Sequence, residues 1–355
     1  MKFTSKQVTT IIVSVAAVFI TMAVFTYVVG DEDSETDSAT SESVSPSDKP
    51  SAGTPAEPAP VAEPKAKQLD STDYMAAQKK VESDPYKELD ELIGLTEVKE
   101  EVKTLANFVK VQKMREEQGL KVPKMSYHLV FTGSPGTGKT TVARIVARIY
   151  KDIGVLPKGH TVETDRSGLV AEYVGQTAVK TNAIVDSALG GVLFIDEAYA
   201  LVPENPGNDY GMEAISTLLK RMEDDRDNLV VIIAGYTNEM KRFIDANPGL
   251  QSRFNRYINF PDYTADELFK IYELHAKKNQ YQLNADAADY LRERLKYVVA
   301  HKDRNFGNGR YSRNLFEKSI QNQANRLSTV SNPTTEMLSE ISKEDVEKAL
   351  SDTKK

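Results

Sequence analysis

The run from Gly133 to Thr140 constrains this chain more than any other part of it. It reads Gly-Ser-Pro-Gly-Thr-Gly-Lys-Thr and fits the pattern G-x-x-x-x-G-K-[ST]. An apolar run at 128–132 precedes it, and 141–150 carries apolar residues at helical spacing. A strand, a glycine turn and a helix in this order bring backbone N–H groups and a helix N-terminus around phosphate oxygens. We therefore predict a phosphate cradle on a parallel α/β sheet.

The chemistry of such a loop predicts a role for each of its last residues. We expect Lys139 to reach the β- and γ-phosphates of ATP, and Thr140 to ligate Mg²⁺. The predicted ATP-binding residues in and directly after the loop are Pro135, Gly136, Thr137, Gly138, Lys139, Thr140 and Thr141.

Two carboxylates end a second apolar run, Gly191-Val-Leu-Phe-Ile-Asp-Glu. Ligands of open α/β sheets bind at the carboxyl ends of the strands, where Asp196 and Glu197 would lie. We expect Asp196 to hold Mg²⁺ through water and Glu197 to orient and polarise the attacking water.

Apolar runs alternate with helical patterns between the loop and Phe260, which predicts a parallel sheet. Beyond Phe260 the pattern is wholly helical. We expect an α/β core at 85–261 and a small all-helical lid domain at 262–355. The predicted strands are 129–132, 161–164, 192–195, 229–234 and 257–260, and the predicted lid helices are 265–279, 285–301, 312–327 and 343–350.

The N-terminal segment, 1–30, contains an uncharged stretch at 11–29. As a helix its 19 residues would span about 28 Å, close to the thickness of a hydrocarbon core. We interpret it as a transmembrane anchor. A cleaved signal peptide is the alternative, although no clear A-x-A site follows.

Residues 31–84 are predicted to be a disordered linker, with a short helix possible at 70–82. Nine acidic residues and one lysine lie in 31–63, so the net charge of this stretch is −8. The net charge of the whole chain is −7, so the remaining residues sum to +1. A nearly neutral body argues against bulk binding of nucleic acid. The chain has no cysteine, which excludes disulfides, thiol catalysis and a cysteine zinc site.

Taken together, these motifs resemble those of AAA+ ATPases over 86–350. Within that family the chain is most similar to the branch that contains stage V sporulation protein K and the red-type Rubisco activase. The matching segments are Glu91-Leu-Ile-Gly-Leu95, the loop at 133–140, Glu172-Tyr-Val-Gly-Gln176, Gly191 to Tyr199, Ala234-Gly-Tyr236, Asn247 to Phe254 and Arg310-Tyr-Ser-Arg-Asn-Leu315.

The resemblance implies further catalytic residues. Arg253 and Arg256 match an arginine-finger pair that would reach the γ-phosphate on a neighbouring subunit. Arg310 matches sensor 2 in the lid, with Arg313 as the alternative.

Three more sites rest on the resemblance. Sensor 1 would be Asn238, with Thr237 as the alternative, because the sequence here is offset by one residue. Ile93 and Gly94 match the segment that packs on the adenine. Tyr173, Val174 and Gly175 match a pore loop whose aromatic side chain would grip a protein client in the centre of a ring.

The function expected from these observations is that of a membrane-anchored, Mg²⁺-dependent ATPase. It would form a homo-oligomer, expected to be a hexamer, that threads or remodels an unnamed protein client. The alternatives are an AAA+ ATPase that acts on nucleic acid as a loader or helicase, and a nucleotide-switched membrane scaffold. Rubisco activation is not implied, because the soluble activase type lacks this anchor and linker.

We expect a single-pass membrane protein with its ATPase domain on the cytoplasmic side. Lys2 and Lys6 precede the apolar stretch, which by the positive-inside rule favours the opposite orientation. Two lysines are a weak signal, and the need for ATP favours the cytoplasmic side.

Overall fold

The computed structural model describes residues 83–352 apart from 124, 174 and 203–208. Everything described belongs to one compact unit of the chain, Ser71–Lys355. The predicted anchor at 11–29, the helix at 70–82 and nearly all of the predicted linker lie outside the described residues. Within the described part, no helix is both long and apolar enough to cross a membrane.

The predicted parallel sheet is confirmed. Five parallel strands lie in the order β2-β3-β4-β1-β5. The three central strands are buried along their whole length, which explains their continuous apolar sequence. The strand bounds are β1 Leu129–Gly133, β2 Thr161–Thr164, β3 Val192–Ile195, β4 Val230–Gly235 and β5 Tyr257–Phe260.

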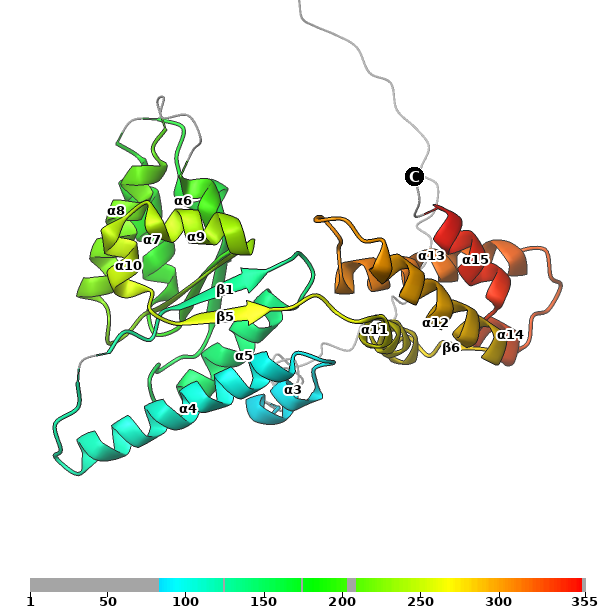
Figure 1. The fold of residues 1–355 in the computed structure, drawn as a ribbon, viewed down its shortest axis with the longest axis horizontal. Coiled ribbons are helices and arrows are strands. Elements are labelled where there is room, and N and C mark those ends of the chain that lie inside the picture. Colours follow the sequence, from blue (N-terminus) through cyan, green and yellow to red (C-terminus); the bar gives the residue numbers. More distant parts are fainter. Residues whose placement is uncertain (1–82, 124, 174, 203–208, 353–355) are drawn as a thin grey trace, which may run out of the picture. The chain divides into compact units, whose positions relative to one another are not determined.

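Helices cover both faces of this sheet (Figure 1). Because side chains alternate along a strand, Leu129 and Phe131 of β1 pack into one core cluster and Val130 into the other. The first cluster is formed with α3 (Pro85–Glu91), α4 (Thr96–Glu117) and α5 (Lys139–Asp152). The second is formed with α6 (Arg166–Leu169), α7 (Thr177–Ala188), the 3₁₀ helix η1 (Ala198–Leu201), α8 (Gly211–Asp224), α9 (Thr237–Asp245) and α10 (Pro248–Arg253).

The lid follows β5 and is helical for most of its length. Tyr272 of α11 meets Phe316 of α13 edge to face, with ring centroids 5.7 Å apart. The helices are α11 Ala265–Lys278, α12 Ala285–Ala300, α13 Gly309–Leu327, α14 Thr335–Ser339 and α15 Lys343–Asp352.

The prediction of an all-helical lid is wrong in one detail. Two short strands, β6 (Gln282–Leu283) and β7 (Glu340–Ile341), pair in parallel within it. Ile341 is completely buried in the core cluster that the lid shares with α5. A two-residue strand leaves no periodic signal, and its partner lies 58 residues away in the chain, so the pairing follows from packing alone.

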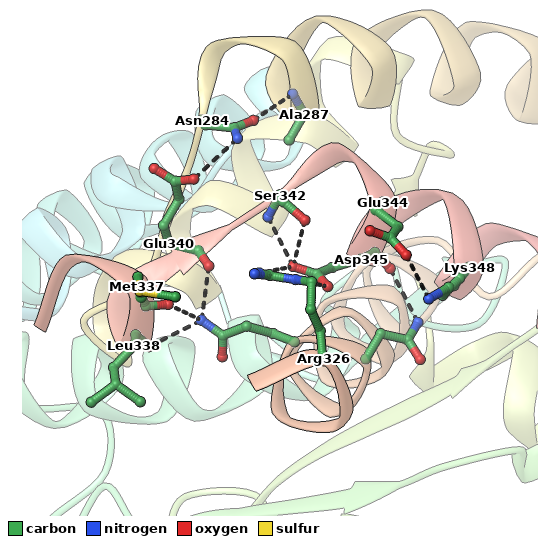
Figure 2. A network of polar contacts seen from close by, with 12 residues as sticks. Asn284, Ala287, Arg326, Met337, Leu338, Glu340, Ser342, Glu344, Asp345 and Lys348 are labelled. Atoms are coloured by element: carbon green, nitrogen blue, oxygen red, sulfur yellow. Dashed lines mark hydrogen bonds and ion pairs between the residues drawn. The ribbon is translucent and has the colours of Figure 1, made fainter. Parts of the chain in front are cut away.

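A buried polar network fixes the end of the lid (Figure 2). The Asp345 side chain is only 1% exposed, and its carboxylate accepts two hydrogen bonds from Arg326, at 3.0 and 2.7 Å. It also accepts from the backbone N–H and the hydroxyl of Ser342, at 3.0 and 2.8 Å. Burial by itself would raise the pKa of Asp345, but these hydrogen bonds outweigh it and lower the pKa.

The same network also holds α13 against the segment that leads into β7. The buried Gln323 amide donates to three backbone carbonyls at 2.8 to 3.2 Å, those of Met337, Leu338 and Glu340. Met337 and Leu338 lie at the carboxyl end of α14, where carbonyls have no partner within the helix, so one side chain satisfies acceptors that the helix leaves unpaired.

Candidate active site

A cavity of about 590 Å³ lies where the glycine loop, the carboxyl ends of β3 and β4, the start of α4 and the lid meet. It is the expected position for a ligand of an open parallel sheet. Most of the predicted nucleotide-site residues line it together: Ile93, Pro135, Gly136, Gly138, Lys139, Thr140, Thr141, Asp196, Glu197 and Arg310.

The glycines of the loop are required by its backbone. Gly136 and Gly138 have φ of 70° and 96°, values that other residues rarely adopt. A Cβ on Gly136 would also lie 2.1 Å from the backbone oxygen of Gly307 in the lid. The loop can therefore keep its shape and its contact with the lid only with glycine at this position.

Lys139 points back into the loop. Its Nζ donates to the backbone oxygens of Gly133 and Ser134, at 2.9 and 2.8 Å. Burial lowers the pKa of Lys139, and the carboxylate of Asp196 opposes this shift. A buried ammonium group held by neutral carbonyls is suited to bind an anion such as phosphate.

Thr137 is the one predicted loop residue that does not line the cavity. Its side chain is fully buried, and its hydroxyl donates to the backbone oxygen of Ser134 at 2.8 Å. It therefore stabilises the loop from behind.

Asp196 and Glu197 follow β3 as predicted and both line the cavity. Burial raises the pKa of Asp196, and the charge of Lys139 opposes the shift. The backbone N–H of Glu197 donates to Asp196 Oδ1 at 3.1 Å. Glu197 has a φ of 49° and an exposed side chain, so that the chain turns sharply and water can reach the carboxylate.

The sensor 1 region differs from the sequence-based expectation. Asn238 and Thr237 begin α9, and neither lines the cavity. Gly235, the last residue of β4, and Tyr236 line it instead. The expectation compared this chain with relatives that have Thr-Asn at the strand end. Here β4 ends at Gly235, one residue later than predicted, and the only signal for Tyr236 is that it directly follows the strand.

On the lid side, Arg310 and its alternative Arg313 both line the cavity, so the structure does not separate them. His275 and Lys278 of α11 add two more basic side chains to this wall. The lid thus contributes to the cavity wall three cationic side chains and a histidine whose pKa is lowered by burial, a charge distribution suited to a polyphosphate.

Sequence reasoning missed Asn308, which joins the lid to the loop. This residue is completely buried, with a φ of 47°. Its Nδ2 donates to the backbone oxygen of Pro135 at 3.3 Å and to Asp262 Oδ1 at 2.9 Å, and its Oδ1 accepts from the Tyr263 backbone N–H at 3.0 Å. The Asn-Gly pair at the start of α13 was the available signal, because such pairs mark turns; the ψ of −120° places Asn308 outside the left-handed helical region.

Two further hydrogen bonds reinforce that joint. The backbone N–H of Gly309 donates to the oxygen of Gly136 at 3.0 Å, and the hydroxyl of Tyr263 donates to the oxygen of Thr137 at 3.2 Å. A ligand that moves the loop must therefore also act on the lid.

Of the two residues predicted to pack on adenine, Ile93 lines the cavity and Gly94 does not. Gly94 has a φ of 61°, and a Cβ there would lie 2.2 Å from a carboxylate oxygen of Glu267. Gly94 makes the turn into α4 possible, whereas Ile93 with Leu92 and Leu95 supplies apolar cavity wall.

Arg253 and Arg256 lie outside this cavity. Arg253, at the end of α10, is 3.7 Å from Glu223. The guanidinium of Arg256 lies over the ring of Phe108, 5.1 Å from its centroid. Neither arginine takes part in the site of its own chain.

The predicted pore segment is only partly described. The side chain of Tyr173 is 67% exposed, and Gly175 has a φ of 76°. Val174 lies outside the described residues. An exposed tyrosine next to a glycine turn is available for contact with another molecule.

The donor set fits ATP with Mg²⁺. Thr140 and Asp196 offer the oxygen ligands that Mg²⁺ prefers, next to the phosphate cradle. Across the described residues, no group of three or more His, Cys, Asp or Glu forms a metal site. Mg²⁺ usually binds through one or two protein ligands together with water and phosphate, so the arrangement suits a metal that arrives with its nucleotide.

The family models match the same two parts of the chain. The model for the ATPase family associated with various cellular activities (AAA) matches 129–262, and the AAA lid domain matches 264–355. The chain belongs to the AAA ATPase family. It is therefore an enzyme that hydrolyses ATP.

Named relatives agree with the predicted branch. Stage V sporulation protein K of Bacillus subtilis is 46% identical over 242 residues, 68% of this chain and 75% of that protein. The ESX-3 secretion system protein EccA3 of Mycolicibacterium smegmatis is 48% identical over 252 residues, 68% of this chain and 41% of that protein. The ESX-1 secretion system protein EccA1 of Mycobacterium tuberculosis is 47% identical over 251 residues.

The match covers 44% of that EccA1 protein, so the chain spans less than half the length of these mycobacterial relatives. Among solved structures, a mutant of Thermotoga maritima RuvB matches 74% of this chain and 71% of that chain, at 21% identity and a TM-score of 0.48.

Proposed function

We propose that this AAA ATPase works as a homo-oligomeric ring, a hexamer, that threads or remodels a protein client near a membrane. Within one subunit, Lys139 would hold the β- and γ-phosphates, Arg310 would contact the nucleotide from the lid, and Glu197 would orient the attacking water. Thr140 and Asp196 would hold Mg²⁺, which neutralises charge on the phosphates when bound.

The position of Arg253 and Arg256 is the main observation in favour of a ring. Phosphoryl transfer needs cationic groups near the γ-phosphate, and these two residues lie away from the cavity of their own chain. They would instead complete the site of the neighbouring subunit. Hydrolysis would then depend on assembly.

A mixing experiment tests this proposal. One variant carries Arg253→Ala with Arg256→Ala and keeps its own Glu197; the other carries Glu197→Gln and keeps both arginines. Each alone should turn over ATP at least about 100-fold more slowly than the wild type. Mixed oligomers, verified by cross-linking of differently tagged subunits, should regain turnover, because the second variant supplies arginines to the first. Mixed oligomers as inactive as the two parents would contradict the proposal.

The exposed Tyr173 supports a protein client. A tyrosine offers apolar contact area at little entropic cost and without demanding a particular sequence. The names of the relatives, a sporulation protein and components of secretion systems, agree with work on proteins. The client itself can be captured with Glu197→Gln, which should bind ATP without completing hydrolysis.

Tyr173→Ala should then abolish remodelling of that client and lower ATP turnover far less. Val179→Ala is the matched control, because Val179 is another apolar side chain, 69% exposed, on the following helix. Normal remodelling by the Tyr173 variant would contradict threading. Stimulation of ATP turnover by DNA or RNA alone would instead favour the nucleic-acid alternative, against which the near-neutral body argues.

The location at a membrane rests on the apolar stretch at 11–29. We place the ATPase domain on the cytoplasmic side, where ATP is available. Protease added to intact cells should leave the ATPase domain uncleaved, and cleavage from outside would overturn this orientation.

A further inference from the structure

The geometry points to Tyr199 as a positioning residue for the carboxylate of Glu197. We infer that the hydroxyl of Tyr199 holds one oxygen of this carboxylate so that the other faces the attacking water. The inference rests on the proposed role of Glu197, and its test separates the two.

The decisive contact is short and direct. Tyr199 Oη donates a hydrogen bond to Glu197 Oε2 at 2.7 Å. Hydrogen bonds to an ionised group are stronger than those between neutral groups. The bond therefore restrains the direction of a side chain that is otherwise exposed.

The backbone of η1 makes this contact possible. Glu197 has a φ of 49°, and its backbone oxygen accepts from the N–H of Ala200 at 2.8 Å. The resulting tight turn lets Tyr199 reach back to a residue only two positions earlier. A left-handed glutamate costs about 1 kcal/mol or more, which is consistent with strain kept at a functional site.

The Tyr199 ring is itself held in place. Its centroid lies 6.1 Å from that of Tyr236, at an interplanar angle of 50°. A Cβ on Gly235 would lie 2.7 to 2.8 Å from two carbon atoms of the Tyr199 ring. The last residue of β4 must therefore be glycine for the ring to keep its position.

These contacts connect the wall of the cavity to the carboxylate of Glu197. Gly235 and Tyr236 line the nucleotide cavity, Tyr199 packs on both, and Tyr199 in turn holds Glu197. A nucleotide that shifts the end of β4 would thus also shift the carboxylate. This coupling gives a reason for a tyrosine at position 199 that packing in the core does not give.

The phenol of Tyr199 keeps the proton that it donates. Burial, followed by the hydrogen bond to Glu197, raises the pKa of Tyr199 well above its usual range.

Tyr199→Phe tests the inference, because it removes the hydroxyl and keeps the ring. In the assembled, full-length ATPase, kcat should fall about tenfold, with the KM for ATP within about twofold of the wild type. The loss of kcat at nearly constant KM is the decisive readout, because a purely structural role of the hydroxyl would change the KM or the melting temperature as well.

Two further variants sharpen the result. Gly235→Ala should displace the ring and lower kcat in the same direction. Tyr281→Phe is the control, because Tyr281 lies in the lid with its ring against Phe316, and it should behave like the wild type. An unchanged kcat in Tyr199→Phe would overturn the inference, and so would a higher kcat, which would mean that the hydroxyl restrains the base.

A double variant separates this inference from the proposed function. With Glu197→Ala in place, Tyr199→Phe should cause no additional loss, because both changes act through one carboxylate. Losses that multiply would overturn the inference and leave the role of Glu197 standing. Full turnover by Glu197→Ala alone would instead remove the proposed role of Glu197, and the inference with it.

Discussion

Two carboxylates of this protein are held in opposite ways: Asp196 in the nucleotide cavity, which is partly buried, and Asp345 in the lid, which is almost completely buried. Asp345 is surrounded by donors, and hydrogen bonds from Arg326 and Ser342 lower its pKa in spite of burial. Asp196 has one hydrogen bond from a backbone N–H, and burial raises its pKa in spite of the charge of Lys139. The same side chain therefore has opposite energetic effects in two regions of one fold.

The difference reflects what each region is for. The network of the lid is complete without a ligand, so its polar groups contribute to stability (Figure 2). In the cavity, Lys139 is held only by neutral carbonyls and Asp196 is only partly satisfied. A nucleotide with its metal would complete these partners, and the binding free energy is larger for groups left without strong partners beforehand.

Lys139→Ala should have the largest effect on activity and little effect on stability. ATP turnover should fall at least about 100-fold, because the phosphates lose their main cationic partner. The free energy of unfolding of the ligand-free protein should change by less than about 1 kcal/mol, since the lysine is buried at a cost. Phosphate release and chemical denaturation measure the two quantities. A large loss of stability would mean that Lys139 contributes to stability without a ligand, as the polar groups of the lid network do.

Asp345→Asn should have the reverse outcome. It leaves Arg326 without its anionic partner and should lower the free energy of unfolding by about 2 kcal/mol, measured by chemical denaturation. Glu344→Gln on the same helix is the control. Glu344 pairs with Lys348 at 2.8 Å on an exposed surface, and such a pair contributes little to stability. Equal losses in the two variants would contradict the importance of burial.

Asn308→Ala should show both effects at a smaller size, because Asn308 is fully partnered and is bonded to the loop that lines the cavity. The loss of its hydrogen bonds to Pro135, Asp262 and Tyr263 should weaken ATP binding severalfold and cost about 1 to 2 kcal/mol of stability. Asn305→Ala, an exposed residue in the same connection, should change neither. Titration calorimetry measures ATP binding and chemical denaturation measures stability. A loss of both would indicate that Asn308 joins the loop to the lid, whereas a loss of stability alone would indicate a local turn.

Asp196→Asn should stabilise the ligand-free protein slightly at neutral pH, while hydrolysis is lost. A folded-state pKa above the unfolded value means that ionisation of Asp196 opposes folding once the pH exceeds that pKa. The gain should therefore fade as the pH falls toward the unfolded value.

The lid carboxylate has the opposite dependence. The folded-state pKa of Asp345 is lowered, so its stabilisation is present above the unfolded value and is lost as the pH falls through the folded one. Denaturation of the wild type and both variants across the acidic range should reveal these opposite trends. Parallel trends would show that the two carboxylates do not differ as described.

Local patterns were enough to predict the sheet and most of its site. The central strands are continuous apolar runs, and the loop at 133–140 and the pair Asp196-Glu197 stand directly at their ends. Because the carboxyl ends of parallel strands share one edge, residues far apart in the sequence had to meet there. Their convergence in one cavity follows from that rule.

Where the outcome depended on a non-local partner, the sequence was insufficient. The pairing of β6 with β7, the burial of Asn308 against the loop and the approach of Tyr199 to Gly235 each join segments with no shared pattern. The end of β4 placed Tyr236 rather than Asn238 in the cavity wall. Sequence periodicity specifies which residues leave water, but only packing decides which of them meet, since that depends on the shape of the whole core.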